Sequence, residues 1–149
     1  MDPIKRFLEY AAAFENVYKD DDWSLLEPYF TEDAVYEVTG GPPFEGRHEG
    51  RDAVFAGLER AVNSFDRRFD SRELEMLEGP ELRDGAVWLR WRATYRVEGA
   101  PDLTVDGEER AVFEGDRIRV LADRFPEEAG PLTLTWFEEH GGKLRPAKS

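Results

Sequence analysis

The chain has 149 residues, a length that suits one domain of ordinary size. Hydrophobic residues make up 40% of the sequence, which is enough for a packed core and excludes disorder as a description of the whole chain. Because 33 acidic residues outnumber 20 basic ones, the net charge is −13, and nucleic acids and anionic membranes are disfavoured as partners.

The first half of the chain predicts three helices and one short strand. Asp2 can cap a first helix, whose apolar residues recur at steps of three and four up to Tyr18. A short second helix is expected at 23–30, with Pro28 kinking or breaking it. The remaining elements expected in this half are a strand at 33–39, a loop at 40–43 and a third helix at 51–64.

The second half predicts mostly strands. Residues 86–97 alternate, so that Trp91 and Tyr95 share an apolar face while Arg90 and Arg92 share the opposite one. The other elements expected here are strands at 69–77, 103–113 and 117–123, and turns at Gly79-Pro80, Asp84-Gly85 and Gly115-Asp116.

The segment 131–140 is compatible with two structures. Leu132 to Thr135 alternate as in a strand, whereas Pro131 and the pair Gly141-Gly142 favour a helix, which we expect. Helices therefore precede strands along most of the chain. This order predicts an α+β fold, with helices packed on one face of a curved antiparallel sheet.

Several classes of site and segment are disfavoured. The chain has no cysteine, which excludes disulfides and thiolate chemistry. No apolar run reaches the ~20 residues of a membrane span, and the charged first ten residues argue against a secretory signal, so we expect a cytoplasmic protein. His48 and His140 form no cluster with carboxylates, and no glycine-rich phosphate motif occurs, so neither a metal nor a cofactor is expected.

Five short segments carry a family resemblance. They are the helix 7–18, DWSLL at 22–26, YFTEDAVY at 29–36, PFEGR at 43–47 and FEGDRI at 113–118. In this order and spacing they resemble the nuclear transport factor 2-like superfamily, and within it the polyketide-cyclase-like (SnoaL-like) domain. We therefore expect a single domain over 1–149, with a core at about 4–125 and a C-terminal extension at 126–149.

The resemblance implies a cone-shaped α+β barrel, with a deep pocket between the concave face of the sheet and the helices. It also implies frequent dimerisation through the outer face of the sheet. The superfamily contains isomerases, cyclases, hydrolases, dehydratases and pure binding domains, so membership by itself does not decide the chemistry.

Candidate catalytic residues follow from the resemblance position by position. The base of the isomerases falls at Val38, which argues against that mechanism, and their oxyanion tyrosine falls at Phe14, with Tyr10 and Tyr18 one turn to either side. The catalytic aspartate of the cyclases falls at Asp123, near the end of the last strand. We therefore expect Asp123 as a general base and Tyr10 or Tyr18 as the hydrogen-bond donor to an oxyanion.

The expected ligand is a small, largely apolar molecule. The residues expected to contact it are aromatic, namely Phe14, Tyr36, Trp91 and Tyr95. Each of these, and Asp123, has a simpler interpretation: the rings as ordinary core packing and the carboxylate as a surface or ion-paired group. His48 lies between two charged residues and is expected in a solvated loop.

An exposed tryptophan among arginines is typical of an interface. Trp88, Arg90 and Arg92 share a sheet face and predict a homodimer through it, unless the C-terminal segment covers Trp88. The function expected is therefore small-molecule binding, with acid–base catalysis on an apolar carbonyl compound left open. The alternative is a non-catalytic dimeric interaction or assembly module.

Overall fold

The computed structural model describes residues 1–147, so the last two residues of the expected extension, 148–149, lie outside it. The helices are α1 (Pro3–Asp20), α2 (Arg51–Ser64) and α3 (Ala129–His140), with 3-10 turns η1 (Trp23–Tyr29), η2 (Asp66–Arg68) and η3 (Gly141–Lys143). The strands are β1 (Phe30–Thr39), β2 (Gly46–Glu49), β3 (Ser71–Arg83), β4 (Ala86–Arg96), β5 (Leu103–Glu114) and β6 (Arg117–Arg124).

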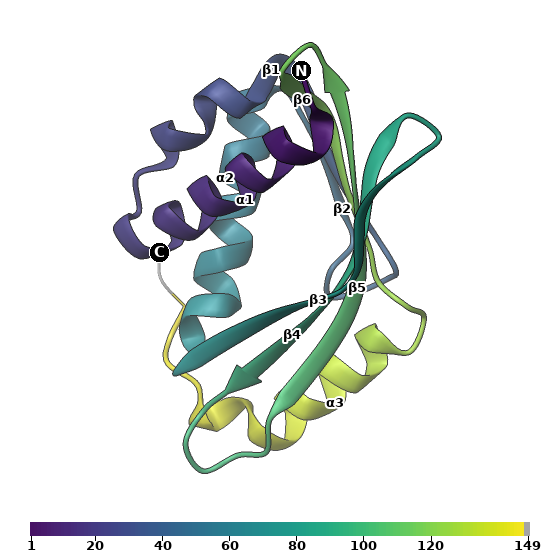
Figure 1. Cartoon of the computed structure of the whole chain (residues 1–149). Helices are drawn as coiled ribbons and strands as arrows, with labels where there is room; N and C mark the ends of the chain where they lie inside the picture. The colour runs from purple at the N-terminus through teal and green to yellow at the C-terminus, as the bar shows by residue number, and fades with distance from the viewer. Residues whose placement is uncertain (148–149) are drawn as a thin grey trace.

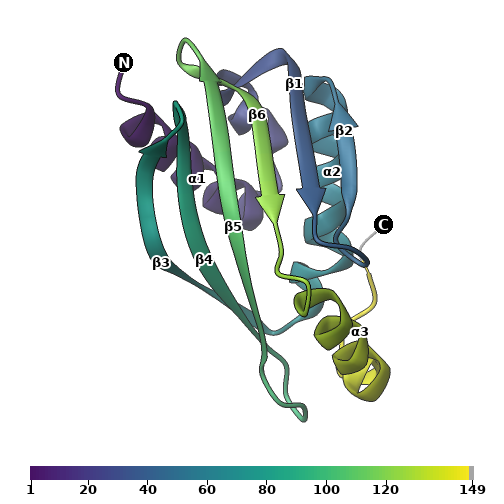
Figure 2. The ribbon, with the colours of Figure 1, turned by 90° about the vertical axis from the view of Figure 1, so that its right-hand side faces the viewer.

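All six strands form one curved sheet in the order β2-β1-β6-β5-β4-β3. Only β1 and β6 pair in parallel, and every other neighbouring pair is antiparallel. The helices α1 and α2 lie together on the concave side of the sheet, and α3 lies at one end of it (Figures 1 and 2). The α+β fold predicted from the sequence is confirmed.

The helices follow local signals closely. The side chain of Asp2 accepts hydrogen bonds from the backbone N–H groups of Ile4 and Lys5, so it caps α1 as expected. The helix ends at Asp21, which has a left-handed backbone with φ of 60°. The bounds of α2 are those expected for the third helix. Among the residues described, no helix is long and apolar enough to cross a membrane.

The ambiguous segment near the end of the chain is a helix, as expected. In α3, Thr133 and Trp136 are buried while Leu132 and Leu134 are exposed, which is helical spacing rather than strand alternation. Trp136 Nε1 donates a hydrogen bond to the carbonyl oxygen of Pro101 at 3.0 Å. This contact attaches α3 to the loop between β4 and β5.

The predicted end of one strand was wrong, and another strand was not predicted. β3 does not stop before Gly79-Pro80 but runs on to Arg83, because these two residues form a bulge: the pairing moves from Glu78 with Arg90 to Glu81 with Trp88. β3 is an edge strand, where a proline without an N–H is tolerated. The strand β2 was not predicted, because its sequence, GRHE, lacks apolar alternation and depends on pairing with β1.

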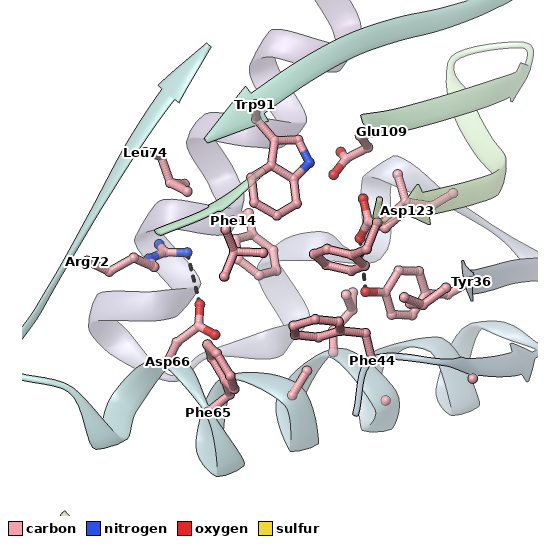
Figure 3. A pocket seen from close by; sticks show the side chains of 18 of the residues that line it. Phe14, Tyr36, Phe44, Phe65, Asp66, Arg72, Leu74, Trp91, Glu109 and Asp123 are labelled. Carbon is pink, nitrogen blue, oxygen red and sulfur yellow. Dashed lines mark hydrogen bonds and ion pairs between the residues drawn. The ribbon is translucent and has the colours of Figure 1, made fainter. Parts of the chain in front are cut away.

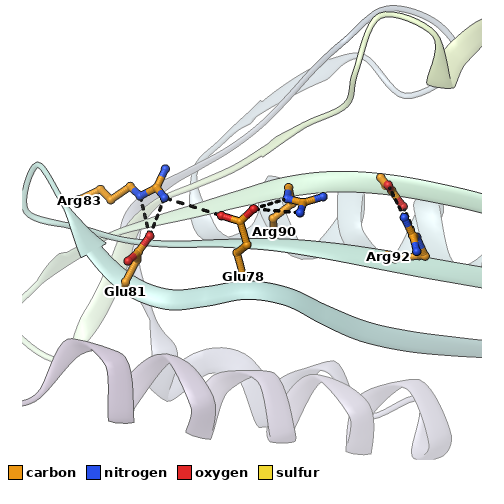
Figure 4. Close-up of polar contacts among 6 residues, drawn as sticks. Glu78, Glu81, Arg83, Arg90 and Arg92 are labelled. Atoms are coloured by element: carbon orange, nitrogen blue, oxygen red, sulfur yellow. Dashed lines mark hydrogen bonds and ion pairs between the residues drawn. The ribbon is translucent and has the colours of Figure 1, made fainter.

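The outer face of the sheet carries ion pairs (Figure 4). Arg92 pairs with Asp106 at 2.7 Å, and Arg90 pairs with Glu78 at 2.9 Å. Trp88, expected to be exposed, is only 8% exposed. What covers it is the guanidinium of Arg83, 3.4 Å from the ring centroid, and not the C-terminal segment that the sequence suggested.

Gly107, in the middle of β5, is expected to resist substitution. A Cβ atom there would lie 2.5 Å from Cζ2 of Trp91, whose ring rests on the glycine backbone. We expect Gly107→Ala to lower the free energy of unfolding by about 1–3 kcal/mol, because the ring and the strand cannot both keep their places.

Urea unfolding measures this change. The matched control is Gly142→Ala, where a Cβ meets nothing within 4 Å. Equal stability of the two variants would contradict the tight contact between Trp91 and Gly107.

Candidate functional site

A cavity of about 690 Å³ lies between α1, α2 and the concave face of the sheet. Most of its wall is apolar and aromatic; the rings come from Phe7, Tyr10, Phe14, Tyr36, Phe44, Phe65, Trp91, Tyr95, Phe125 and Phe137. Charged and polar groups gather in two places on this wall, which Figure 3 shows at its opposite sides. A volume of this size suits a small organic molecule.

The first polar group is a pair of carboxyls on neighbouring strands. Glu109 on β5 lies directly opposite Asp123 on β6 in the antiparallel register, and both line the cavity. The hydroxyl of Tyr36 donates a hydrogen bond to Oδ2 of Asp123 at 3.0 Å. The other oxygen of Asp123, Oδ1, is shielded from solvent and has no hydrogen-bond partner. We call Glu109 and Asp123 the acid pair.

Enclosure changes the ionisation of the acid pair. Burial, reinforced by the neighbouring Asp123, raises the pKa of Glu109 well above its ordinary value. Burial also raises the pKa of Asp123, although the hydrogen bonds from Glu109 and Tyr36 oppose the change. The pKa values of both carboxyls are therefore raised, and that of Glu109 is raised the more strongly.

Trp91 approaches the acid pair from β4. Its indole nitrogen points toward the carboxyl of Glu109 (Figure 3), yet Nε1 is buried without a hydrogen-bond partner. The ring is held between Gly107, beneath it, and Phe125, whose ring meets it edge-on at 5.6 Å. The packing therefore fixes the direction of an N–H group beside the acid pair.

His48 was expected in a solvated loop, and this prediction was wrong. The residue is half-buried on β2, lines the cavity and stacks on the ring of Tyr36 with centroids 5.9 Å apart. Gly57 of α2 leaves room for it, because a Cβ there would lie 2.7 Å from Nε2 of His48. His48 therefore holds the tyrosine that donates to Asp123.

The second polar group surrounds Arg72 of β3. Its guanidinium pairs with Asp66 at 3.2 Å and with Glu15 of α1 at 2.9 Å, and its side chain is only 6% exposed. Burial raises the pKa of Asp66 to about 6, although Arg72 opposes the change. These ion pairs connect α1, η2 and β3 at one side of the cavity (Figure 3).

The structure brings most of the predicted site residues to the cavity. Asp123 and all four residues expected to contact the ligand line it, as do Tyr10 and Val38. Tyr18 does not, and its ring lies instead against the guanidinium of Arg72, 4.2 Å away. His140 is also absent from the wall and lies beside Trp136.

Glu109, Asp66 and Arg72 were not among the site residues predicted from the sequence. Glu109 belongs to a Glu-Glu-Arg run that has the composition of a solvated strand. One signal could have identified it: in β5 the odd-numbered positions Leu103, Val105 and Ala111 are buried, and Glu109 has the same parity.

No metal site accompanies these acids. Among residues 1–147, no group of three or more histidine, aspartate or glutamate side chains is placed to hold a metal ion. The side chains of the wall themselves offer proton transfer, hydrogen bonding and contact with aromatic rings.

Comparisons with known proteins agree with this architecture. A family model described as a SnoaL-like domain matches residues 9–124. A comparison with curated protein sequences finds no significant match.

Among solved structures, Bal32a from a soil-derived mobile gene cassette is 21% identical, with a TM-score of 0.66 over 91% of this chain and 99% of that one. An NTF2-like protein from Burkholderia xenovorans LB400 is 19% identical, with a TM-score of 0.61 over 89% and 97%. An LEH-like epoxide hydrolase of M. tuberculosis is 16% identical, with a TM-score of 0.61 over 92% and 96%. At these identities the likeness shows the fold.

The acid pair is expected to lower the free energy of unfolding. Glu109→Gln should therefore raise this free energy by about 1–3 kcal/mol near neutral pH. The folded state keeps a proton on Glu109 that the unfolded chain releases above its ordinary pKa of 4.5. Stability of the wild type therefore falls as pH rises from that value toward the higher folded pKa. The advantage of the variant should disappear below about pH 4, where the unfolded carboxyl is also protonated.

Thermal unfolding over a range of pH tests this expectation. Glu108→Gln is the matched control, because it removes one negative charge from the other face of the same strand. A Glu109→Gln variant that is less stable than the wild type at neutral pH would contradict the assignment.

Proposed function

The chain belongs to the SnoaL-like domain family, and from this membership and the geometry of the cavity we propose that it binds a small, largely apolar molecule and exchanges protons with it. The observation that carries the proposal is the acid pair: two facing carboxyls in an aromatic cavity of about 690 Å³. Paired carboxyls whose environments separate their pKa values are typical of sites that use one acid and one base.

The two members of the pair have different roles in this proposal. Asp123, ionised and held by the hydroxyl of Tyr36, is the base that removes a proton from carbon next to a carbonyl group. Glu109, protonated, is the acid that gives its proton to the carbonyl oxygen, so that the products are an enol and a protonated Asp123. The reverse steps return both protons.

An apolar carbonyl compound is the substrate class that this chemistry favours. The aromatic wall favours apolar molecules, and the buried pair offers one proton donor and one acceptor for a single polar group. Glu109 takes the donor role expected of Tyr10 or Tyr18. Tyr10 lines the cavity without a hydrogen bond to Asp123, and burial raises its pKa well above the ordinary value.

Deuterium exchange tests the proposal without knowledge of the natural substrate. In D₂O, the protein is expected to accelerate exchange of the methyl protons of 2-acetylnaphthalene, followed by ¹H NMR. Asp123→Asn should slow the catalysed exchange by about 100-fold, which is a usual contribution of a general base. Glu109→Gln should also slow it, because the acid that stabilises the enol is lost.

The control is Asp33→Asn, a change at an exposed carboxylate on β1. Its exchange rate should equal that of the wild type. Exchange at the wild-type rate in Asp123→Asn would remove this residue from the mechanism.

A homodimer through the outer face of the sheet remains a proposal of its own. The support is the surface around Arg90 and Arg92, where ion pairs follow the strands (Figure 4); Trp88 lies beneath it, covered by Arg83. The alternative function, a non-catalytic dimeric module, shares this surface but makes no use of the acid pair.

Sedimentation velocity at micromolar concentrations tests self-association. We expect a species of twice the chain mass, and we expect the double variant Arg90→Glu/Arg92→Glu to dissociate it through charge repulsion. Arg60→Glu, at an exposed position of α2, is the control. A single species of one chain mass in the wild type would refute the dimer.

A further inference from the structure

Acidic side chains dominate the charged part of the cavity wall. The acids that line it are Glu15, Glu45, Asp66, Glu75, Glu109 and Asp123. The basic residues that line it are Arg68 and Arg72, with His48 as the one other titratable nitrogen base among the lining residues described. Even with one proton shared by the acid pair, the wall carries a net negative charge.

Both arginines are already engaged. Arg72 is held by Asp66 and Glu15, so its charge is neutralised by two carboxylates. Arg68 donates through Nε to the carbonyl oxygen of Arg145 at 2.8 Å. Arg72 is therefore neutralised by carboxylates, whereas the bond of Arg68 to a backbone carbonyl leaves the positive charge of Arg68 in place.

Among the ion pairs of residues 1–147, none joins a cation to either member of the acid pair. Around Asp123, the hydrogen bonds come from the neutral hydroxyl of Tyr36 and from the carboxyl of Glu109. Phe44 and Phe125, which also line the cavity, stack on each other with centroids 4.1 Å apart and bring no charge to the wall. Neutral donors and aromatic faces accommodate a cation or a neutral group better than an anion.

We propose that the cavity selects its ligand by charge, admitting uncharged or cationic apolar molecules and excluding carboxylates, because acids stand at both of its polar ends and outnumber its two arginines, of which Arg72 is already held by carboxylates. The inference rests on the proposed function, since it describes the ligand of the same cavity. It narrows the proposed substrate class from all apolar carbonyl compounds to those that carry no anionic group.

We call this selection by charge the charge filter. Three planar probes of nearly equal shape test it. They are 2-acetylnaphthalene, which is neutral, 2-naphthoate, an anion, and 2-naphthamidine, a cation near neutral pH. Their dissociation constants come from isothermal titration calorimetry with the full chain. The naphthoate should bind on the order of 100-fold more weakly than the ketone, because a carboxylate a few ångströms from a partly buried like charge is strongly repelled.

The amidine separates charge repulsion from the general difficulty of burying an ion. If repulsion decides, the amidine should bind at least as tightly as the ketone. Equally weak binding of both ions would show that desolvation alone excludes them, and it would overturn the proposal. Naphthoate binding as tight as that of the ketone would also overturn it.

A double variant should admit the anion. Glu15→Gln/Asp66→Asn removes both carboxylates from Arg72 and leaves its guanidinium free inside the cavity. We expect naphthoate affinity to rise at least about tenfold while that for the ketone stays within about twofold. The control is Glu73→Gln, on the outer face in contact with Arg96, which should leave all three affinities unchanged.

The outcomes distinguish the two proposals. Unaltered naphthoate affinity in a folded double variant would overturn the charge filter, and the wild-type probes decide the question if that variant does not fold. If the ketone and the amidine both fail to bind the wild type, the proposed binding function fails with the filter. If the ketone binds and the naphthoate binds equally well, only the filter fails.

Discussion

Two carboxyl groups that face each other in an apolar interior repel each other strongly when both are ionised. The contacts made by Glu109, Asp123 and their neighbours in this cavity depend on that constraint. The register of β5 and β6 sets Glu109 opposite Asp123. Desolvation and mutual repulsion raise the pKa values of both carboxyls, an arrangement that the interior of a protein normally avoids. The hydroxyl of Tyr36 donates a hydrogen bond to Asp123, and the indole nitrogen of Trp91 points toward Glu109.

Glycines on two different elements make this arrangement possible. A glycine inside a strand or a helix weakens it, because the backbone is freer when unfolded and no side chain packs. The ring of Trp91 packs against the backbone of Gly107 in β5, and Gly57 leaves room for His48 against α2. Both rings therefore approach the site more closely than ordinary side-chain packing would allow. At both glycines some local stability is lost, and in return the rings of Trp91 and His48 can lie close to the site.

Much of the fold and part of the site could be predicted from the sequence. Capping and apolar spacing located α1 and α2, and alternation located β4 with the lining residue Trp91. Glu109 could not be recognised so easily, because its role depends on a partner on another strand and its neighbours are charged. The pairing of β2 with β1 is likewise non-local, so the short polar strand that carries His48 has no signal of its own.

The bulge at Gly79-Pro80 has a consequence for how copies of this protein can meet. β3 is an edge strand, and its free N–H and C=O groups would otherwise offer a regular ladder to the edge of another sheet. The proline supplies no N–H, and the bulge interrupts the spacing of the groups on either side of it. An edge strand of a second sheet therefore cannot pair with β3 along its full length. The proline and the bulge thereby protect the protein from open-ended fibre growth along β3.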